Sequence, residues 1–246
     1  MDNQASFAQE NDRNDPGDAL PSLIWISKAA ELAESVFASD SRISITHTDN
    51  IIWDKATNEF VVSLNSGHLN SPMGGVSFNM VPHTENEKQT VVSLGLRYSV
   101  KFPTEFLWNL GGHLPGLFGT YVSSAGTSAA ANDVFECRCR WDAKGKLGVN
   151  VRQNSEYDPN EWAISAQNKV SLTRDTWYDI SLIAHIDGSL EVSVDGTPLF
   201  QGACHAGFEN LSGVRFCAYS MDTMGIEGSY LKIKNVEIRS KFHNEC

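Results

Sequence analysis

The sequence lacks the apolar segments that mark membrane or secretory proteins. It has no apolar run of about 18 residues, the length that a membrane-spanning helix needs. Its first residues, MDNQASFAQENDRNDPGD, are polar and acidic and contain none of the apolar core of a signal peptide. We therefore expect no membrane partner and a cytoplasmic location, or a secreted protein if a leader has been removed.

Cysteine and histidine occur without the spacing of a metal site. The five cysteines are an odd number and are not spaced as zinc ligands, and the histidines are scattered. Cys137 and Cys139 are two residues apart on an expected strand, so they share one face and are poorly placed for a disulfide. We expect both to be buried thiols, and we predict no metal and no cofactor.

Basic residues are also scarce. Lysine and arginine number 19 against 30 aspartates and glutamates, which gives a net charge of −11. This balance argues against a nucleic-acid partner, because nucleic acids are bound chiefly through their phosphates. Net charge says nothing about distribution, so a local basic cleft is compatible with it.

What the sequence does contain is a series of short strand-like segments. Residues 1–20 read as a flexible tail. Residues 21–246 read as a single domain that begins with one helix over Ser22–Phe37. About a dozen alternating segments separated by Asp-Gly and Lys-Gly-Lys turns indicate an all-β antiparallel sandwich. The main expected strands are 42–48, 59–64, 75–81, 91–102, 134–141, 146–153, 169–172, 177–186, 190–194, 214–220 and 229–239.

The segment Gly111–Gly119, with the sequence GGHLPGLFG, has four glycines, one proline and one histidine. Glycine serves where the backbone takes positive φ or passes close to another group, and proline fixes φ. We predict a shaped loop at the rim or floor of a sheet, and such loops often carry function.

Alternation along two neighbouring strands places polar side chains on one face. Glu136, Arg138 and Arg140 alternate with core residues, and Asn150 and Arg152 do the same on the next strand. If the strands pair as a hairpin, the arginines gather around Glu136. Arginine is suited to bidentate binding of carboxylates, so this patch is a candidate site for an acidic ligand.

Three further polar residues are candidates from the same alternation. Arg97 and Lys101 lie opposite the core side of 91–102, and they line either the same concave face or ordinary surface. Tyr219 shares a strand face with Arg215 and Cys217, and it is either structural or directed into a cleft.

The segment from Tyr98 to Trp108, YSVKFPTEFLW, runs into Gly111–Leu117, GGHLPGL. Together they resemble the alginate and glucuronate lyases of polysaccharide lyase family 14, whose hallmark is YxVxFP…F-W followed by GGKLPGL. The resemblance implies a β-jelly roll with a concave sheet forming a ligand cleft. It also places His113 where the family has an active-site lysine, beside Gly112.

The chain departs from that family's catalytic residues at most positions. The family's Ser-x-Arg aligns with Glu136 and Arg138, and its Tyr-x-Tyr falls on Gly148 and Asn150. The resemblance therefore carries over the arginine and not the serine, the lysine or the tyrosines.

These observations leave three functional hypotheses. A β-eliminating lyase needs a group that neutralises the uronate carboxylate, a base and an acid. In the first hypothesis Arg138 and Asn150 hold the carboxylate of an acidic polysaccharide or oligosaccharide, while His113 or Tyr219 exchanges protons. The second is a non-catalytic lectin on a lyase scaffold. The third is an enzyme for a small molecule, with His113 and Glu136 as an acid–base pair. The candidate catalytic residues are His113, Arg138, Glu136 and Tyr219, and the candidate substrate-binding residues are Arg140, Asn150, Arg152, Arg97, Lys101 and Gly112.

Overall fold

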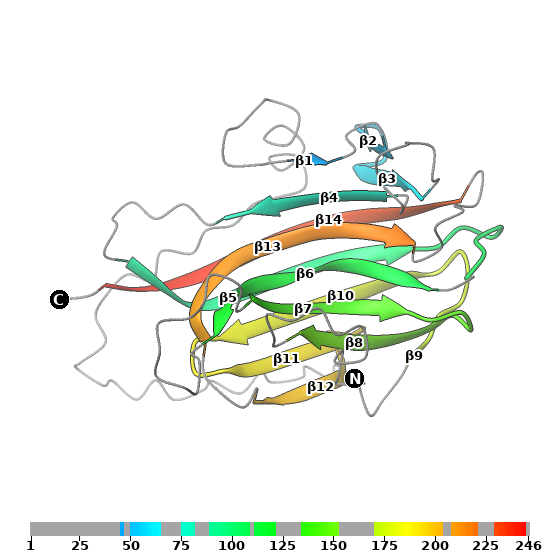
Figure 1. Ribbon diagram of the computed structural model, residues 1–246. Helices are drawn as coiled ribbons and strands as arrows, with labels where there is room; N and C mark the ends of the chain where they lie inside the picture. Colours follow the sequence, from blue (N-terminus) through cyan, green and yellow to red (C-terminus); the bar gives the residue numbers. More distant parts are fainter. Residues whose placement is uncertain are drawn as a thin grey trace, which may run out of the picture.

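Two antiparallel sheets of seven strands each make up the described part of the molecule (Figure 1). The computed structural model describes residues 45–46, 50–64, 75–81, 89–108, 111–121, 134–152, 170–203, 208–220 and 229–244. The predicted all-β sandwich of jelly-roll type is confirmed. The expected N-terminal tail and the helix over 22–37 lie outside the described residues.

We call the two layers the front sheet and the back sheet. The front sheet runs in the order β1 (Ile45–Thr46), β4 (Gly75–Met80), β13 (Phe208–Ser220), β6 (Gly112–Tyr121), β7 (Val134–Trp141), β8 (Lys146–Arg152) and β9 (Val170–Ser171). The back sheet runs in the order β12 (Thr197–Ala203), β11 (Ser189–Val194), β10 (Trp177–His185), β5 (Gln89–Lys101), β14 (Tyr230–Asn244), β3 (Glu59–Ser63) and β2 (Ile51–Asp54). Within the described residues there is no helix with the length and apolar character needed to cross a membrane.

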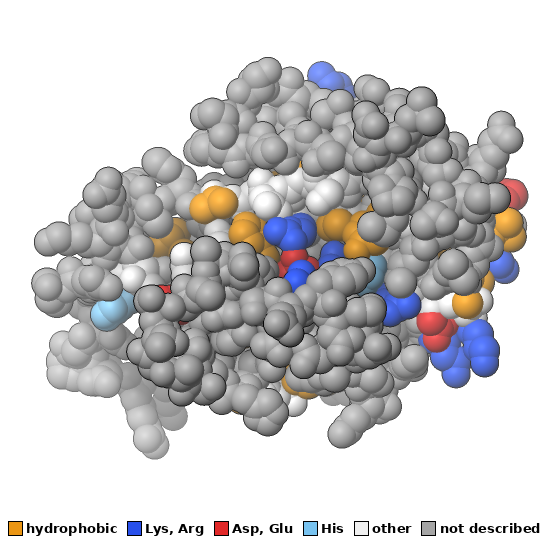
Figure 2. Space-filling view, viewed as in Figure 1, with side chains coloured by type: hydrophobic (Ala, Val, Ile, Leu, Met, Phe, Trp, Pro, Cys, Tyr) orange, Lys and Arg blue, Asp and Glu red, His pale blue; other side chains and the backbone are white. Residues whose placement is uncertain are grey.

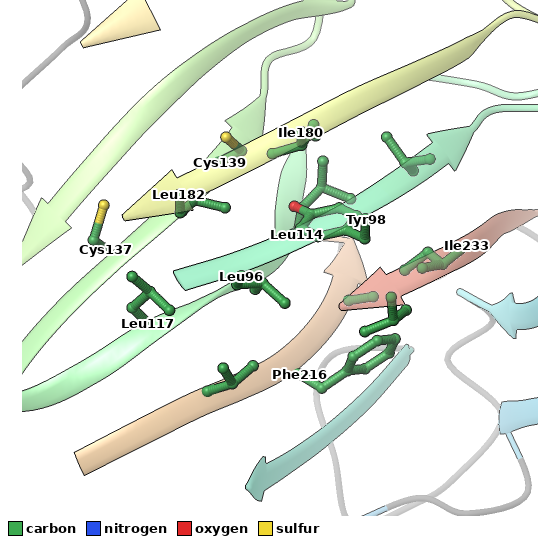
Figure 3. Close-up of a cluster of buried hydrophobic side chains, with 14 of the residues drawn as sticks. Leu96, Tyr98, Leu114, Leu117, Cys137, Cys139, Ile180, Leu182, Phe216 and Ile233 are labelled. Atoms are coloured by element: carbon green, nitrogen blue, oxygen red, sulfur yellow. The ribbon is translucent and has the colours of Figure 1, made fainter. Parts of the chain in front are cut away.

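The core lies between the sheets and is built by alternation along each strand. Leu96 and Tyr98 of β5 meet Leu114 and Leu117 of β6 across the interior (Figure 3). Phe216 of β13 completes this cluster and stacks on Phe78 with ring centroids 4.7 Å apart. The inward set predicted for residues 91–102 is confirmed, because each of its members is at most 1% exposed.

The two cysteines of β7 also point into this core. Cys137 and Cys139 are free thiols with no exposed surface, as the sequence predicts. Burial raises the pKa of Cys139 to about 12, so its thiol stays protonated at neutral pH. Since the inward side of β7 is apolar, its polar side chains all face the other way.

The glycine-rich segment is a strand and not the loop that its composition suggested. Residues 112–121 form β6, which pairs with β13 on one side and β7 on the other. A Cβ at Gly116 would overlap the Cys137 carbonyl, and one at Gly119 would overlap the Asn210 carbonyl. The glycines therefore serve close backbone approach, and in this segment only Gly111 takes a positive φ, of 91°.

Pro115 lies in a bulge of β6, where a missing N–H costs no ladder hydrogen bond. The register shifts between His113 and Gly116, which puts Leu114 and Leu117 inward and His113 on the opposite face. Tyr98 of the back sheet donates a hydrogen bond from its hydroxyl to the Pro115 carbonyl, with an O–O distance of 3.1 Å. One sheet thus holds the bulge of the other in place.

Candidate functional site

The side of the front sheet that faces away from the core carries a cluster of charged residues, which we call the polar face. In the β7–β8 hairpin Glu136 lies opposite Arg152, and Arg138 lies opposite Asn150. This is the pairing that alternation predicts. Figure 2 shows basic, acidic and histidine side chains gathered near the middle of this side of the molecule.

Glu136 lies at the centre of the polar face and its carboxylate is held by two arginines. Arg138 approaches from the same strand, with 2.8 Å between Nη2 and Oε2. Arg215, from β13, forms the second ion pair through Nη1 and Oε1. Glu136 is 3% exposed and Arg138 is 8% exposed, so this charge pair is shielded from water. Its attraction is consequently stronger than that of a surface pair.

Arg215 is a member of the polar face that the sequence alone does not single out. Its Nε donates a 2.9 Å hydrogen bond to the Asn79 side-chain oxygen on β4, and its guanidinium lies 5.3 Å from the centre of the Phe118 ring. Alternation does place it on one face of its strand with Cys217 and Tyr219. Its link to Glu136 depends on β6 lying between β13 and β7, which no local pattern reveals.

His113 and Tyr219 form the aromatic end of the polar face. They are paired across β6 and β13, with ring centroids 5.0 Å apart. The Arg138 guanidinium lies 5.8 Å from the centre of the Tyr219 ring. Burial and then the charges of Arg138 and Arg140 lower the pKa of His113 to about 2, so its imidazole is neutral at physiological pH.

Cys217 adds a thiol to the middle of the polar face. Arg138 Nη1 lies 3.8 Å from its Sγ, within the range of a weak hydrogen bond to sulfur. Burial raises the pKa of this thiol in spite of the nearby arginines. The thiol therefore remains protonated and is a packing partner of Arg138 rather than an anion.

Three predicted binding residues have polar groups that are not engaged by acidic side chains. Arg140 and Arg152 are half-buried, and neither forms an ion pair within the described residues. Asn150 is 5% exposed, and in the described part of the chain its side-chain Nδ2 has no hydrogen-bond partner. Buried donors of this kind are normally satisfied by a ligand or water.

Gly112 is a structural member of the site and carries no side chain into it. It lies opposite Trp141 on β7 and Ser220 on β13. A Cβ at this position would overlap the Trp141 ring and the Tyr219 carbonyl. Its contribution is the close packing that brings His113 and Tyr219 together.

Arg97 and Lys101 do not belong to this cluster. The sequence left open whether they share the concave face, and the structure places them on β5 of the back sheet, on its outer side. Arg97 pairs with Asp179 at 3.5 Å, and Lys101 pairs with Asp175 at 3.1 Å. Period-two alternation tells which side of a strand is polar, but it cannot tell which of two sheets the strand joins.

The register also separates two residues proposed to act together. His113 lies opposite Arg140, whereas Glu136 is four residues away along β7. Four strand residues span about 13 Å, too far for a direct hydrogen bond between these side chains. This register speaks against a direct His113–Glu136 acid–base pair. Among the described residues no group of three or more metal-ligating side chains occurs.

The fold and the polar face define the class of protein. A jelly-roll sandwich with arginines, an amide, a histidine and a tyrosine on one sheet is an architecture suited to an extended acidic ligand. Residues 54–195 match the family model named Polysaccharide lyase 14, which covers more than half of the chain. The chain belongs to polysaccharide lyase family 14 and is a lyase-like, carbohydrate-active protein.

Solved structures share this fold at low sequence identity. A mutant of the alginate lyase Aly36B in complex with alginate trisaccharide matches with a TM-score of 0.63 and 15% identity, over 88% of this chain and 93% of the other. The marine alginate lyase from Aplysia kurodai matches with a TM-score of 0.57 and 16% identity, over 87% of this chain and 97% of the other. At such identities the likeness shows the fold alone. A comparison with curated proteins finds no match.

Proposed function

We propose that this protein binds a uronate-containing glycan along the polar face and cleaves it by β-elimination. The observation that carries the proposal is the excess of positive charge on that face in an acidic protein. Among the described residues that face carries four arginines and one glutamate, and two of the four arginines, Arg140 and Arg152, have no acidic partner there. A carboxylated ligand supplies the missing negative charge.

The first chemical task is to neutralise the carboxylate of the uronate unit. Arg140 and Asn150 offer unengaged donors on either side of Arg138, and Asn150 faces Arg138 across the hairpin. Hydrogen bonds from these groups withdraw charge from the carboxylate and make the neighbouring C5–H more acidic. Asn150 is buried and Arg140 is half-buried, so both donors are restrained before the substrate arrives.

The second task is proton exchange, for which Tyr219 and His113 are placed at one end of this donor group. A base removes the C5 proton, and the electron pair of that bond forms the C4–C5 double bond as the C4–O4 bond breaks. The leaving O4 takes up a proton from the acid. A neutral imidazole is able to accept a proton, and a carboxylate bound near Arg138 and Arg140 offsets the two charges that lower the pKa of His113.

The test combines product formation with binding on the same preparation. Incubation with glucuronan, polymannuronate or polyguluronate should produce the ultraviolet absorbance of a 4,5-unsaturated uronate. Tyr219→Phe removes only the hydroxyl and should lower the rate by about 100-fold or more while binding persists. Arg140→Ala should weaken binding by about tenfold or more. Lys144→Ala, in the exposed turn of the same hairpin, is the matched control and should leave both unchanged.

A lectin is the second candidate, and one observation favours it. Glu136 occupies the guanidinium groups of Arg138 and Arg215, and the pKa of His113 is far below neutrality, which leaves a weak base in the free protein. Saturable glycan binding that is weakened by Arg140→Ala, with no unsaturated product from any of the three polymers, would identify a lectin. Absence of both binding and product would reject the uronate ligand itself.

A further inference from the structure

The outer side of the back sheet has a hollow of its own, on the opposite side of the sandwich from the polar face. Its volume is about 340 Å³, which is within the lower range of small-ligand pockets. It lies over the three central strands β14, β5 and β10. The strand register gives its layout: Gly95 is in the middle, between Arg239 on β14 and Ile183 on β10.

Gly95 creates the floor of the hollow, and the fold does not require a glycine there. A Cβ at Gly95 would have its nearest neighbours at 3.8 and 3.9 Å, which is ordinary contact, and its φ is not in the left-handed region. Gly116 and Gly119 differ, since a Cβ at either would overlap neighbouring backbone. Glycine in a strand interior weakens the strand, and it often marks a place where a ligand approaches the backbone.

The positions around Gly95 carry hydroxyl groups and cations. Ser93 and Ser181 are half-buried beside the floor, and Arg97, Arg239 and Lys241 stand at the rim. Lys241 has no ion-pair partner within the described part of the chain.

The two arginines of the rim are held by carboxylates, of which Asp179 is exposed and Glu237 is half-buried. Arg97 pairs with Asp179 at 3.5 Å, and Arg239 donates from both Nε and Nη2 to Oε1 of Glu237. The arginine side chains are 60% and 64% exposed. Pairs with this exposure are weak, so a ligand carboxylate is able to compete for either guanidinium.

We propose that this hollow binds one acidic sugar residue, either free or at the end of a glycan. The cations at the rim suit its carboxylate, the serine hydroxyls suit its hydroxyl groups, and the half-buried Ile183 offers an apolar surface to the ring. This site stands on different strands from the polar face and does not rest on the function proposed for that face.

The decisive variant fills the hollow without disturbing the strand. Gly95→Leu places a side chain in the hollow, while Gly95→Ala adds a single methyl group and serves as the matched control. Binding of free glucuronate, measured by calorimetry or by NMR shifts of back-sheet amides, should fall at least tenfold in Gly95→Leu and persist in Gly95→Ala. Glucose, which lacks the carboxylate, should bind at least tenfold more weakly than glucuronate to the unchanged protein.

A second variant keeps the proposal testable if Gly95→Leu fails to fold. Lys241→Glu alters an exposed residue and reverses the charge at the rim, so it should weaken glucuronate binding at least tenfold in a folded protein. Glucuronate binding that is unchanged in both Gly95→Leu and Lys241→Glu would overturn the proposal, as would equal binding of glucose.

An Arg140→Ala background, in which the polar face is impaired, shows whether the hollow binds the free sugar acid or the end of a glycan. Tighter binding of an oligoglucuronate than of glucuronate, lost in Gly95→Leu, assigns the hollow to glycan ends. Equal binding of the two assigns it to the free acid. Since the polar face is tested by Arg140→Ala and the hollow by Gly95→Leu, failure of one proposal is distinct from failure of the other.

Discussion

Glu136 carries a shielded carboxylate that two arginines hold in place, and its removal takes this counter-charge away from the buried Arg138. We expect Glu136→Gln to lower the free energy of unfolding by about 3 kcal/mol or more, the usual cost of breaking a buried ion pair from one side. Urea denaturation measures this. Glu191→Gln, at an exposed position of β11, should change stability by less than about 0.5 kcal/mol. Equal effects of the two substitutions would show that the Glu136 pair contributes no stability.

His113 makes stability depend on pH in a defined direction. Its pKa is about 2 in the folded protein, against about 6.5 in an unfolded chain, so unfolding takes up a proton below pH 6.5. The stability that His113 contributes is therefore present above about pH 6.5 and is lost as the pH falls. The loss continues as the pH falls from about 6 toward the folded-state pKa, because the unfolded chain is protonated there and the folded protein is not.

The measurement is the unfolding free energy between pH 4.5 and 7.5, for the unchanged protein and for His113→Gln. Other groups titrate in the same range, and the difference between the two curves isolates the histidine. The variant should show the shallower dependence on pH. Parallel curves would contradict a neutral, buried imidazole.

Sequence patterns located single residues of the site better than they located their partners. Alternation correctly placed Glu136, Arg138 and Asn150 on one side of the β7–β8 hairpin, because period two is a local property of a strand. Arg215 was not identified as the partner of Glu136, because that contact spans β13, β6 and β7, which are distant in sequence. The orientation of a side chain is local information, whereas ion pairing depends on strand order.

At the scale of the element, β6 has little freedom to change at its glycines. Gly116→Ala would push a methyl group against the Cys137 carbonyl, so β6 and β7 would have to separate. We expect the free energy of unfolding to fall by about 1–3 kcal/mol and the Tm to fall with it, as for other overpacked sites. Gly95→Ala on β5 is the comparison, and it should be neutral or slightly stabilising because its Cβ has room. A Gly116→Ala variant as stable as Gly95→Ala would refute the close-approach role of Gly116.

The misreading of β6 as a loop has a physical reason. Four glycines and a proline in nine residues satisfy the composition of a loop, and they equally satisfy a central strand whose neighbours lie very close. Only the three-dimensional environment separates the two cases. The hairpin turns at Asp187–Gly188 and Asp195–Gly196 were predicted correctly, since a short turn is fixed largely by its own residues.

For the whole molecule, the net charge of −11 opposes the charge of the polar face. A polyuronate approaching from a distance meets repulsion, and it meets attraction only within about a Debye length, roughly 10 Å in 0.1 M salt. We expect added salt to raise the association rate severalfold or leave it unchanged, and to raise the dissociation rate. Stopped-flow binding at several salt concentrations measures both rates. An association rate that falls steeply with salt would instead indicate attraction at long range.

The sequence left open which sheet carries Arg97 and Lys101, because that assignment depends on the whole molecule. Their polar orientation on β5 was evident from the sequence, but β5 packs between β10 and β14 in the back sheet. The two layers of a sandwich have the same alternation, so composition and period do not assign a strand to one of them. Long-range pairing decides this assignment, and it is the part of the fold that lies beyond local sequence rules.

The bulge at Pro115 has a consequence for how chain length varies in related proteins. His113 and Gly116 lie on the same face of β6 with two residues between them, where a regular strand has one. The loss of a single residue here would therefore restore simple alternation. The side chains on both sides of the deletion would keep their present faces, with Leu117 in the core and Phe118 outside it, because His113 and Gly116 already share one face. Relatives of this protein should therefore tolerate the loss of one residue between these two positions, whereas a one-residue change elsewhere in β6 would turn over every side chain beyond it.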